Sequence, residues 1–283
     1  MVETLKRKFD GDGVTVLLWH GLPAVELVNP AGRAVVTLLG AHVVEYAPAG
    51  QEELLFLSGK SEFRSGKAIR GGVPVCFPWF GAAPEGKSGS HGWARITEWE
   101  LVFADRERAV FTLRTPEFSL RYTVSPGAEL SMRLEIVNVS GRELAYSGAL
   151  HTYFRVGNVA ETEILGLDGV TFRDALTGER HVQTGPVRID REVDRAYITD
   201  ADVTIVDPVL KRRIRVSKSG SRSTMVWNPW IDKARRMPDF GDEEYPQMLC
   251  IEAANVPAVD DARTLAPGAE GELSQTLRAE PLL

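Results

Sequence analysis

The strongest constraint on the fold is a strict alternation of apolar and polar residues on both sides of one turn. Every second residue is apolar in the segments 120–124 and 130–136, and Ser125-Pro126-Gly127 lies between them. A period of two places alternate side chains on opposite faces of a β-strand. The two segments therefore predict an antiparallel hairpin with one face in a core.

Similar short apolar or alternating segments recur along the chain, separated by turns rich in glycine and proline. No long window keeps the 3.6-residue period of a helix, and no internal repeat or linker is evident. We therefore expect residues 1–283 to form a single all-β domain of two large packed sheets. The other expected strands are 14–19, 24–28, 34–39, 42–46, 54–57, 99–103, 110–114, 145–150, 163–167, 187–190, 196–199, 203–207, 212–217, 223–227, 248–253 and 271–278.

Charge and cysteine content narrow the class of protein. The formal net charge of −6 argues against general binding to nucleic acid or membranes, although it allows a local basic pocket for a small anion. Cys76 and Cys250 lie far apart among apolar neighbours, so we expect buried free thiols. Free thiols, with no signal peptide and no apolar run of membrane-spanning length, favour a cytoplasmic protein. We expect a monomer.

The segment 67–95 has the composition of a binding surface. It combines Arg70, two consecutive glycines and several aromatic residues with Arg95 at its end. Glycines let a backbone approach a ligand closely, aromatic rings provide flat walls, and guanidinium groups bind anions. The segment therefore predicts a concave surface for a polar, negatively charged ligand.

Two residues suggest proton transfer. His151 lies among apolar and aromatic residues in 147–154, where it is either a hydrogen-bonded core histidine or a reactive group. Glu252 is a lone acid in the apolar run 248–255, where a buried carboxylate is costly unless it is paired or functional. The alternative for Glu252 is an outward position on an edge strand. Together the two residues form a candidate acid–base pair that requires no cofactor.

The remaining polar candidates have less specific patterns. His91 lies in a glycine-rich loop, where we expect a ligand contact, whereas Asp194 reads by composition as an ordinary loop acid. The run 227–230, Trp-Asn-Pro-Trp, is equally typical of a sugar platform and of a plug at the end of a sandwich. We expect His42 to pack, and His20 and His181 to lie on the surface. No phosphate loop, Rossmann glycine pattern or cysteine-rich metal site is present.

Six segments together resemble the hexose-6-phosphate mutarotases, which are glucose-6-phosphate 1-epimerases within the aldose 1-epimerase superfamily. Arg-Gly-Gly followed by Pro, Phe-Pro and Phe-Gly is specific to this branch, as is Leu-His-Thr-Tyr-Phe with a late Glu in an apolar strand. The resemblance implies a galactose-mutarotase-like β-supersandwich of mostly antiparallel sheets. It also implies interconversion of the α and β anomers of a phosphorylated hexose. The segments, in the family's order, are 68–81, 91–95, 150–154, 194–197, 227–230 and 250–255.

The resemblance also assigns roles to single residues. It makes His151 and Glu252 the catalytic pair. At one position the chain departs from the family, because Ser90 stands where a glutamine often precedes the His-Gly pair. Serine is shorter and cannot make the paired contact of an amide, so one sugar contact is lost or bridged by water. The matching substrate-binding residues are Arg70, His91, Arg95 and Asp194.

Mutarotation requires two proton movements, one at the anomeric hydroxyl and one at the ring oxygen. We expect Glu252 to act as general base on the hydroxyl and His151 as general acid to the ring oxygen. Unperturbed pKa values of about 4.3 for glutamate and about 6.5 for histidine suit these roles near neutrality. We expect Arg70 and Arg95 to bind the phosphate, with Lys67 assisting from the rim.

Three alternatives remain on the residues alone. A neutral-sugar aldose 1-epimerase would keep the acid–base pair and would not need the arginines. A non-catalytic sugar-phosphate-binding module would bind its ligand without accelerating anomerisation. A β-sandwich lyase or glycosidase would usually need a longer chain or a second, suitably placed carboxylate.

Overall fold

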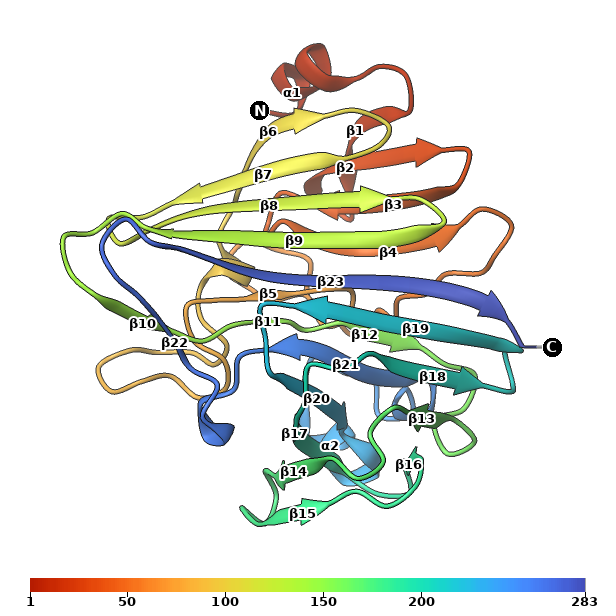
Figure 1. Cartoon of the computed structure of the whole chain (residues 1–283). Helices are drawn as coiled ribbons and strands as arrows, with labels where there is room; N and C mark the ends of the chain where they lie inside the picture. Colours follow the sequence, from red (N-terminus) through yellow and green to blue (C-terminus); the bar gives the residue numbers. More distant parts are fainter. Residues whose placement is uncertain (283) are drawn as a thin grey trace.

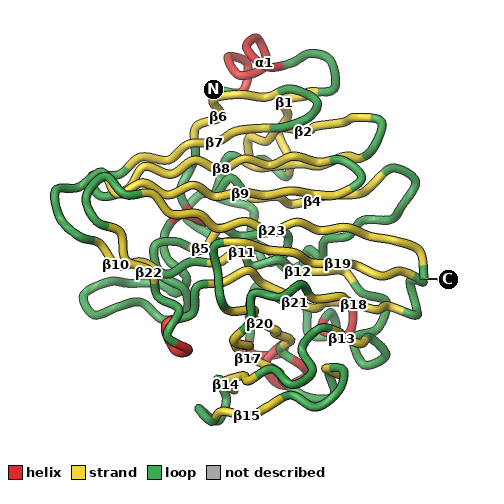
Figure 2. Tube along the Cα trace, viewed as in Figure 1, coloured by secondary structure: helices red, strands yellow, loops and turns green. Residues whose placement is uncertain are grey.

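Two stacked layers of antiparallel strands make up most of the computed structural model, which describes residues 1–282 (Figures 1 and 2). The first layer is a nine-stranded sheet. In it the strand nearest the C-terminus, β23, lies in the middle, between β19 and β9. In sheet order the strands are β16 (Val187–Arg188), β13 (Glu163–Leu165), β18 (Val203–Asp207), β19 (Arg212–Ser219), β23 (Glu270–Pro281), β9 (Glu129–Asn138), β8 (Phe118–Pro126), β7 (Ala109–Arg114) and β6 (Glu100–Ala104).

Two further sheets form the second layer. The four-stranded sheet packs on β8, and the eight-stranded sheet contacts β23 and β19 through its central strands. The four-stranded sheet is β1 (Val14–Trp19), β2 (Leu22–Asn29), β3 (Gly32–Thr37) and β4 (His42–Pro48). The eight-stranded sheet is, in order, β15 (Arg180–Val182), β14 (Thr171–Asp174), β17 (Val193–Ile198), β20 (Ser223–Asn228), β21 (Met248–Ala254), β11 (Ala149–Leu150) and β5 (Val75–Cys76), with β12 (Tyr153–Arg155) also paired to β21. A separate pair joins β10 (Leu144–Tyr146) to β22 (Arg263–Leu265).

The predicted hairpin is confirmed as β8 and β9. The two strands pair antiparallel over their whole length, and the apolar residue at every second position is buried. These side chains belong to one large core between the two layers. The prediction of an all-β fold with large, packed antiparallel sheets is therefore confirmed.

The sequence patterns missed two short helices. One is α1 (Val2–Phe9), which has no buried residue, and the other is α2 (Trp230–Arg236), in which only Ala234 is buried. In α1, Leu5 and Phe9 pack against the core, but eight residues are too few for a helical period to be established from the sequence alone. Three single-turn helices, η1 (Ala94–Ile96), η2 (Tyr245–Gln247) and η3 (Pro257–Val259), complete the elements. Within residues 1–282, none of the helices has the length and apolar character required to cross a membrane.

The consecutive glycines in 67–95 have a different purpose from the one expected. Both have positive φ, +128° at Gly71 and +58° at Gly72. A Cβ atom would lie 2.4 Å from the Phe56 carbonyl oxygen at the first position and 2.3 Å from the Val43 carbonyl oxygen at the second. The expectation that these glycines admit a ligand is therefore wrong, because they let the chain pack tightly against its own backbone.

Candidate active site

The floor of the main candidate site is built by strand register. A cavity of about 620 Å³ lies over one face of the eight-stranded sheet. In that sheet Glu252 of β21 is directly opposite Met225 of β20. Met225 is opposite Ala196 of β17, which is in turn opposite Arg173 of β14. Directly opposite residues share a face. The result is a straight row of four side chains from four strands, and all four line the cavity.

A second row runs beside the first because residues two apart in a strand point the same way. It consists of Cys250, Trp227 and Asp194, again in direct cross-strand register. Trp227 and Asp194 line the cavity, and Cys250 is fully buried. Cys76 is also buried and unpaired, so the prediction of two buried free thiols is confirmed.

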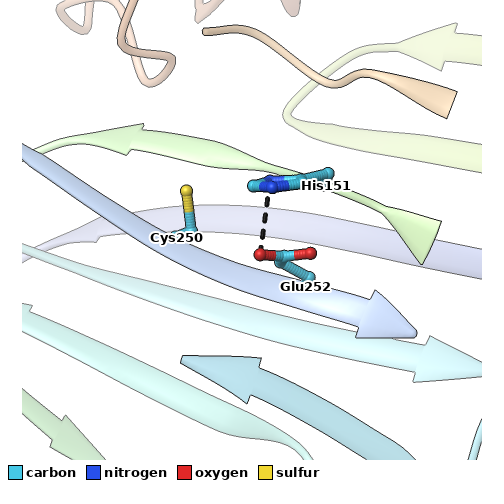
Figure 3. Close-up of side chains that lie close together, drawn as sticks. All are labelled: His151, Cys250 and Glu252. Atoms are coloured by element: carbon cyan, nitrogen blue, oxygen red, sulfur yellow. Dashed lines mark ion pairs between the residues drawn. The ribbon is translucent and has the colours of Figure 1, made fainter. Parts of the chain in front are cut away.

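His151 comes to this floor from the segment between β11 and β12, where its backbone N–H donates to the Pro74 carbonyl oxygen. Its Nδ1 lies 3.2 Å from Oε1 of Glu252 (Figure 3), and their side chains are 8% and 1% exposed. The ring of Tyr153 stacks on the imidazole with a centroid distance of 4.7 Å and an interplanar angle of 5°. Since β21 lies inside the sheet, the edge-strand alternative for Glu252 is wrong.

Burial shifts the pKa values of His151 and Glu252 in opposite directions. Loss of solvent is the main cause that lowers the pKa of His151, and the charges of Arg70 and Arg95 add to it. Loss of solvent also raises the pKa of Glu252, with a further contribution from Asp194. The two groups are in contact and both disfavour charge, so one proton can be carried by either of them. Such a pair is suited to giving and taking protons on one substrate.

His91 faces the pair from the loop before η1. Its ring centroid is 5.5 Å from that of His151 and 4.9 Å from that of Phe80. The backbone N–H of Gly81 donates to His91 Nδ1 at 3.4 Å. Burial lowers the pKa of His91 to about 3, helped by nearby arginine charges. The neutral ring therefore carries its proton on Nε2 and can act as a donor.

Arg70 is a fixed donor at the wall of the cavity. Its Nη1 donates to the Tyr153 hydroxyl at 2.8 Å, and its Nη2 lies 3.0 Å from Oδ2 of Asp239. Burial alone would lower the pKa of Arg70, but Tyr153 and Asp239 outweigh it and raise that pKa. The guanidinium is thus held in one orientation by two partners.

Asp194 lies in the second row beside a lysine from α2. Lys233 Nζ is 3.9 Å from Asp194 Oδ2 and 3.1 Å from Glu192 Oε1, and it sits 5.8 Å from the Trp227 ring centroid. Burial raises the pKa of Asp194, and Lys233 opposes this shift. Lys233, like Arg173, was not among the residues expected from sequence, since both belong to short elements that the patterns did not predict.

Ser90 and Arg95 line a neighbouring cavity of about 550 Å³ instead of the main one. Arg95 Nη2 donates to the Ser90 carbonyl oxygen at 2.8 Å and approaches its Oγ at 3.3 Å. Lys67 lies 3.5 Å from Glu62 and lines neither cavity. The structure thus brings together one set of expected residues, namely Arg70, His91, His151, Asp194 and Glu252.

The tryptophans of 227–230 divide between the two alternatives. Trp227 lines the cavity, as a sugar platform would. Trp230 packs on Tyr245 at a centroid distance of 5.1 Å, as a plug would. Asn228 fixes the turn between them, because its Nδ2 donates to the Tyr245 and Met248 carbonyl oxygens and its Oδ1 accepts from the Trp230 N–H.

One group of side chains has the composition of a metal site. A ligand atom of each of His151, Cys250 and Glu252 lies within 4.8 Å of the other two (Figure 3). Nitrogen, sulfur and oxygen ligands of this kind suit zinc. Burial raises the pKa of the Cys250 thiol. The same set contains the candidate acid–base pair of His151 and Glu252.

Solved structures define the class of protein to which this fold belongs. A Salmonella typhimurium protein whose structure is described as that of a "putative mutarotase" aligns with a TM-score of 0.87 at 29% identity, covering 95% of this chain and 94% of its own. A galactose mutarotase-like protein from Lactobacillus casei aligns with a TM-score of 0.73 at 16% identity, which supports the fold alone. The fold is therefore that of the galactose mutarotases.

Sequence comparison gives the family. The family model described as Aldose 1-epimerase matches residues 23–278. A Cenchrus ciliaris protein named "Putative glucose-6-phosphate 1-epimerase" is 36% identical over 88% of this chain and 82% of its own length. An Escherichia coli protein of the same name is 34% identical over 82% of this chain and 83% of its own. The chain belongs to the aldose 1-epimerase family.

Proposed function

We propose that this protein is a hexose-6-phosphate 1-epimerase that interconverts the α and β anomers of glucose 6-phosphate or a related hexose 6-phosphate. The observation that carries the proposal is the buried contact of 3.2 Å between His151 and Glu252 at the floor of a cavity. The names of the plant and bacterial relatives support the phosphorylated substrate. No cofactor is required for this chemistry.

In the proposed mechanism Glu252 removes the proton of the anomeric hydroxyl while His151 protonates the ring oxygen. The bond between C1 and the ring oxygen breaks, and the open-chain aldehyde rotates about C1–C2. On closure the former ring oxygen, now a hydroxyl, attacks the other face of the aldehyde and returns its proton to His151, while Glu252 returns its proton to the anomeric oxygen, so the enzyme ends in its starting state. The opposite pKa shifts suit these roles, because the raised pKa makes the Glu252 carboxylate a stronger base and the lowered pKa makes the His151 imidazolium a stronger acid than either group is in water.

The other expected residues would position the sugar. His91, neutral and protonated on Nε2, would donate to a sugar oxygen, and Asp194 would accept from hydroxyls. Arg70 would bind the substrate as a fixed donor and add positive potential for its phosphate. Arg95 would contribute positive charge to substrate binding. It would also hold Ser90 in place, on the side of the cavity wall where His91 lies.

A panel of substrates tests the proposal. Exchange NMR measures anomerisation directly for glucose 6-phosphate, glucose and galactose, with the spontaneous rate as the baseline. We expect the highest kcat/KM for the phosphorylated sugar. A preference for the neutral sugars would favour the aldose 1-epimerase alternative. Binding without acceleration of any sugar would favour the non-catalytic module. A cytoplasmic monomer remains our expectation for the protein's location and assembly.

A further inference from the structure

The thiol of Cys250 is a reactive group that the proposed mechanism leaves unused. Cys250 and Glu252 are two residues apart on β21, so their side chains point to the same face of the strand (Figure 3). The thiol is fully buried, and it donates only weakly, to Met248 Sδ at 3.7 Å. A ligand atom of each of His151, Cys250 and Glu252 lies within 4.8 Å of the other two. The candidate acid–base pair therefore has a soft sulfur atom within reach.

Two polar atoms beside this sulfur are buried without a hydrogen bond. Within residues 1–282, these are Nδ1 of His151 and Oε2 of Glu252. Buried polar atoms nearly always have a partner, so atoms without one indicate a place for a ligand. The substrate meets the imidazole and the carboxylate in the proposed mechanism, but a sugar has no atom that binds sulfur strongly. A metal ion with affinity for nitrogen, oxygen and sulfur would engage all three side chains.

The spacing of the three side chains suits a tetrahedral ion. Zinc binds nitrogen and oxygen ligands at about 2.0–2.1 Å, which places two such atoms about 3.3 Å apart. Nδ1 of His151 and Oε1 of Glu252 are 3.2 Å apart. The sulfur lies at up to 4.8 Å from the other ligand atoms and would approach by about 1 Å, since a zinc–sulfur bond of about 2.3 Å requires about 3.6 Å. The fourth position of the ion would remain for water.

The ligands themselves supply the charge that a divalent ion requires. A carboxylate and a thiolate together neutralise it, and the thiol proton passes to the solvent when the ion binds. The surrounding charges are mixed. Arg95 opposes a cation at His151, Asp194 favours one at Glu252, and Arg70 is already paired with Asp239. The site therefore buries no net charge when the ion is bound to its own two anions.

We propose that His151, Cys250 and Glu252 bind a thiophilic divalent cation of the class of zinc, and that the bound ion inhibits the enzyme. The binding site depends on these side chains alone, whereas the inhibition rests on the proposed function. An ion bound to the carboxylate occupies the base, and an imidazole bound to the ion cannot become the imidazolium acid. The ion would also compete with the sugar at the floor of the cavity. Magnesium and calcium prefer oxygen ligands, so the thiol selects against them.

Calorimetric titration of the tag-free, reduced and chelator-treated protein with zinc tests the site directly. We expect one ion per chain in the wild type. Binding to Cys250→Ala should be weaker by at least about 10- to 100-fold, because the loss of even an outer partner of a ligand has this effect. If Cys250→Ala does not fold by circular dichroism, Cys250→Ser serves in its place and should show a loss as well.

Cys76→Ala is the matched control. It removes the other fully buried thiol, which is outside the set of three, and it should bind zinc as the wild type does. Cobalt(II) then reports on the sulfur ligand, because a cobalt–thiolate bond gives a charge-transfer band in the near ultraviolet. The band should appear in the wild type and in Cys76→Ala and be absent from Cys250→Ala. Equal zinc affinity in the wild type and Cys250→Ala, or no binding to the wild type tighter than about 1 mM, would overturn the proposal.

Exchange NMR with glucose 6-phosphate measures the inhibition. The rate of each protein with zinc is divided by its own rate with chelator, so differences in basal activity do not enter. Zinc should raise the apparent KM of the wild type and of Cys76→Ala, whereas magnesium at the same concentration should not. Cys250→Ala should require at least about tenfold more zinc for the same effect. A wild type that binds zinc at these residues and keeps its full rate would overturn the inhibitory role.

The two measurements separate this proposal from the proposed function. If the wild type binds zinc through Cys250 but accelerates no hexose 6-phosphate, the proposed function fails and the metal site stands. If the wild type is an active epimerase that zinc neither binds nor inhibits, the metal site fails and the function stands.

Discussion

Replacing Glu252 by glutamine is the sharpest test of the acid–base pair. Glutamine has nearly the same shape but cannot take a proton, and the altered atom lies in the 3.2 Å contact with His151. A positioned general base contributes about 10²- to 10⁴-fold to rate, so kcat should fall by that factor. The loss should appear in kcat more than in KM, because the contact matters most while the proton is moving.

The structure also predicts how stability responds to this substitution. Burial raises the pKa of Glu252, so above about pH 4.3 the folded protein holds a proton that the unfolded chain has released. Stability from this group is therefore present at low pH and is lost as pH rises. Glu252→Gln removes the titration, so its Tm should equal or exceed that of the wild type at pH 8. Loss of activity in a protein of undiminished Tm would be chemical in origin.

Saturation transfer between the anomeric protons of glucose 6-phosphate measures the rate, with the uncatalysed rate subtracted. His151→Asn provides a second single variant. Because the two residues act as a unit, the rate of the double variant should be about that of the slower single variant. Near wild-type rates in both folded single variants would refute the assignment. Multiplying losses in the double variant would show that the two residues act independently.

Three further predictions concern binding and stability. Arg70→Ala should raise KM for glucose 6-phosphate and cost about 1–3 kcal/mol of unfolding free energy, because it leaves the buried Tyr153 hydroxyl and the half-buried Asp239 carboxylate without their partner. Urea titrations of the two proteins at matched pH test this, and an unaltered midpoint would contradict it. Gly72→Ala should lower the free energy of unfolding by roughly 2 kcal/mol or more, because φ at this position is +58° and the added Cβ would lie 2.3 Å from a carbonyl oxygen. A Tm unchanged from the wild type would contradict this. Burial lowers the pKa of His42 from 6.5 to about 4, so the unfolding free energy of the wild type should fall by roughly 2–3 kcal/mol between pH 7.5 and pH 4.5. In His42→Gln this fall should be smaller by about that amount. The same pH dependence of stability in both proteins would show that His42 is not its origin.

The sequence predicted the parts of the fold in which burial has a simple period. The strands β8 and β9 have one face in the core, so their alternation is visible in the residues alone. In β20 and β21 every residue is buried, so no alternation exists and only the apolar character marks the strand. That same uniformity made Glu252 conspicuous, because a charge stands out in an apolar run.

What the sequence could not predict depends on pairing between distant segments. The placement of β21 between β20 and β11 brings Glu252 to His151, and no local pattern contains that information. Arg173 was missed for a related reason. The strand β14 has four residues with one buried, so Thr-Phe-Arg-Asp reads as a loop until its neighbours are known. Short strands at the border of a sheet can be recognised only from their pairing with neighbouring strands in the folded structure.

The central position of β23 has a consequence for how the chain folds during synthesis. Its neighbours β9 and β19 are both translated earlier, and each must wait with an unpaired edge for the strand that joins them (Figure 1). Exposed edges invite pairing with other chains. A nascent chain stalled before residue 270 would thus hold two half-sheets with open edges, and we expect it to need chaperones or to aggregate. Completion of the nine-stranded sheet is in this sense a late event that one strand controls.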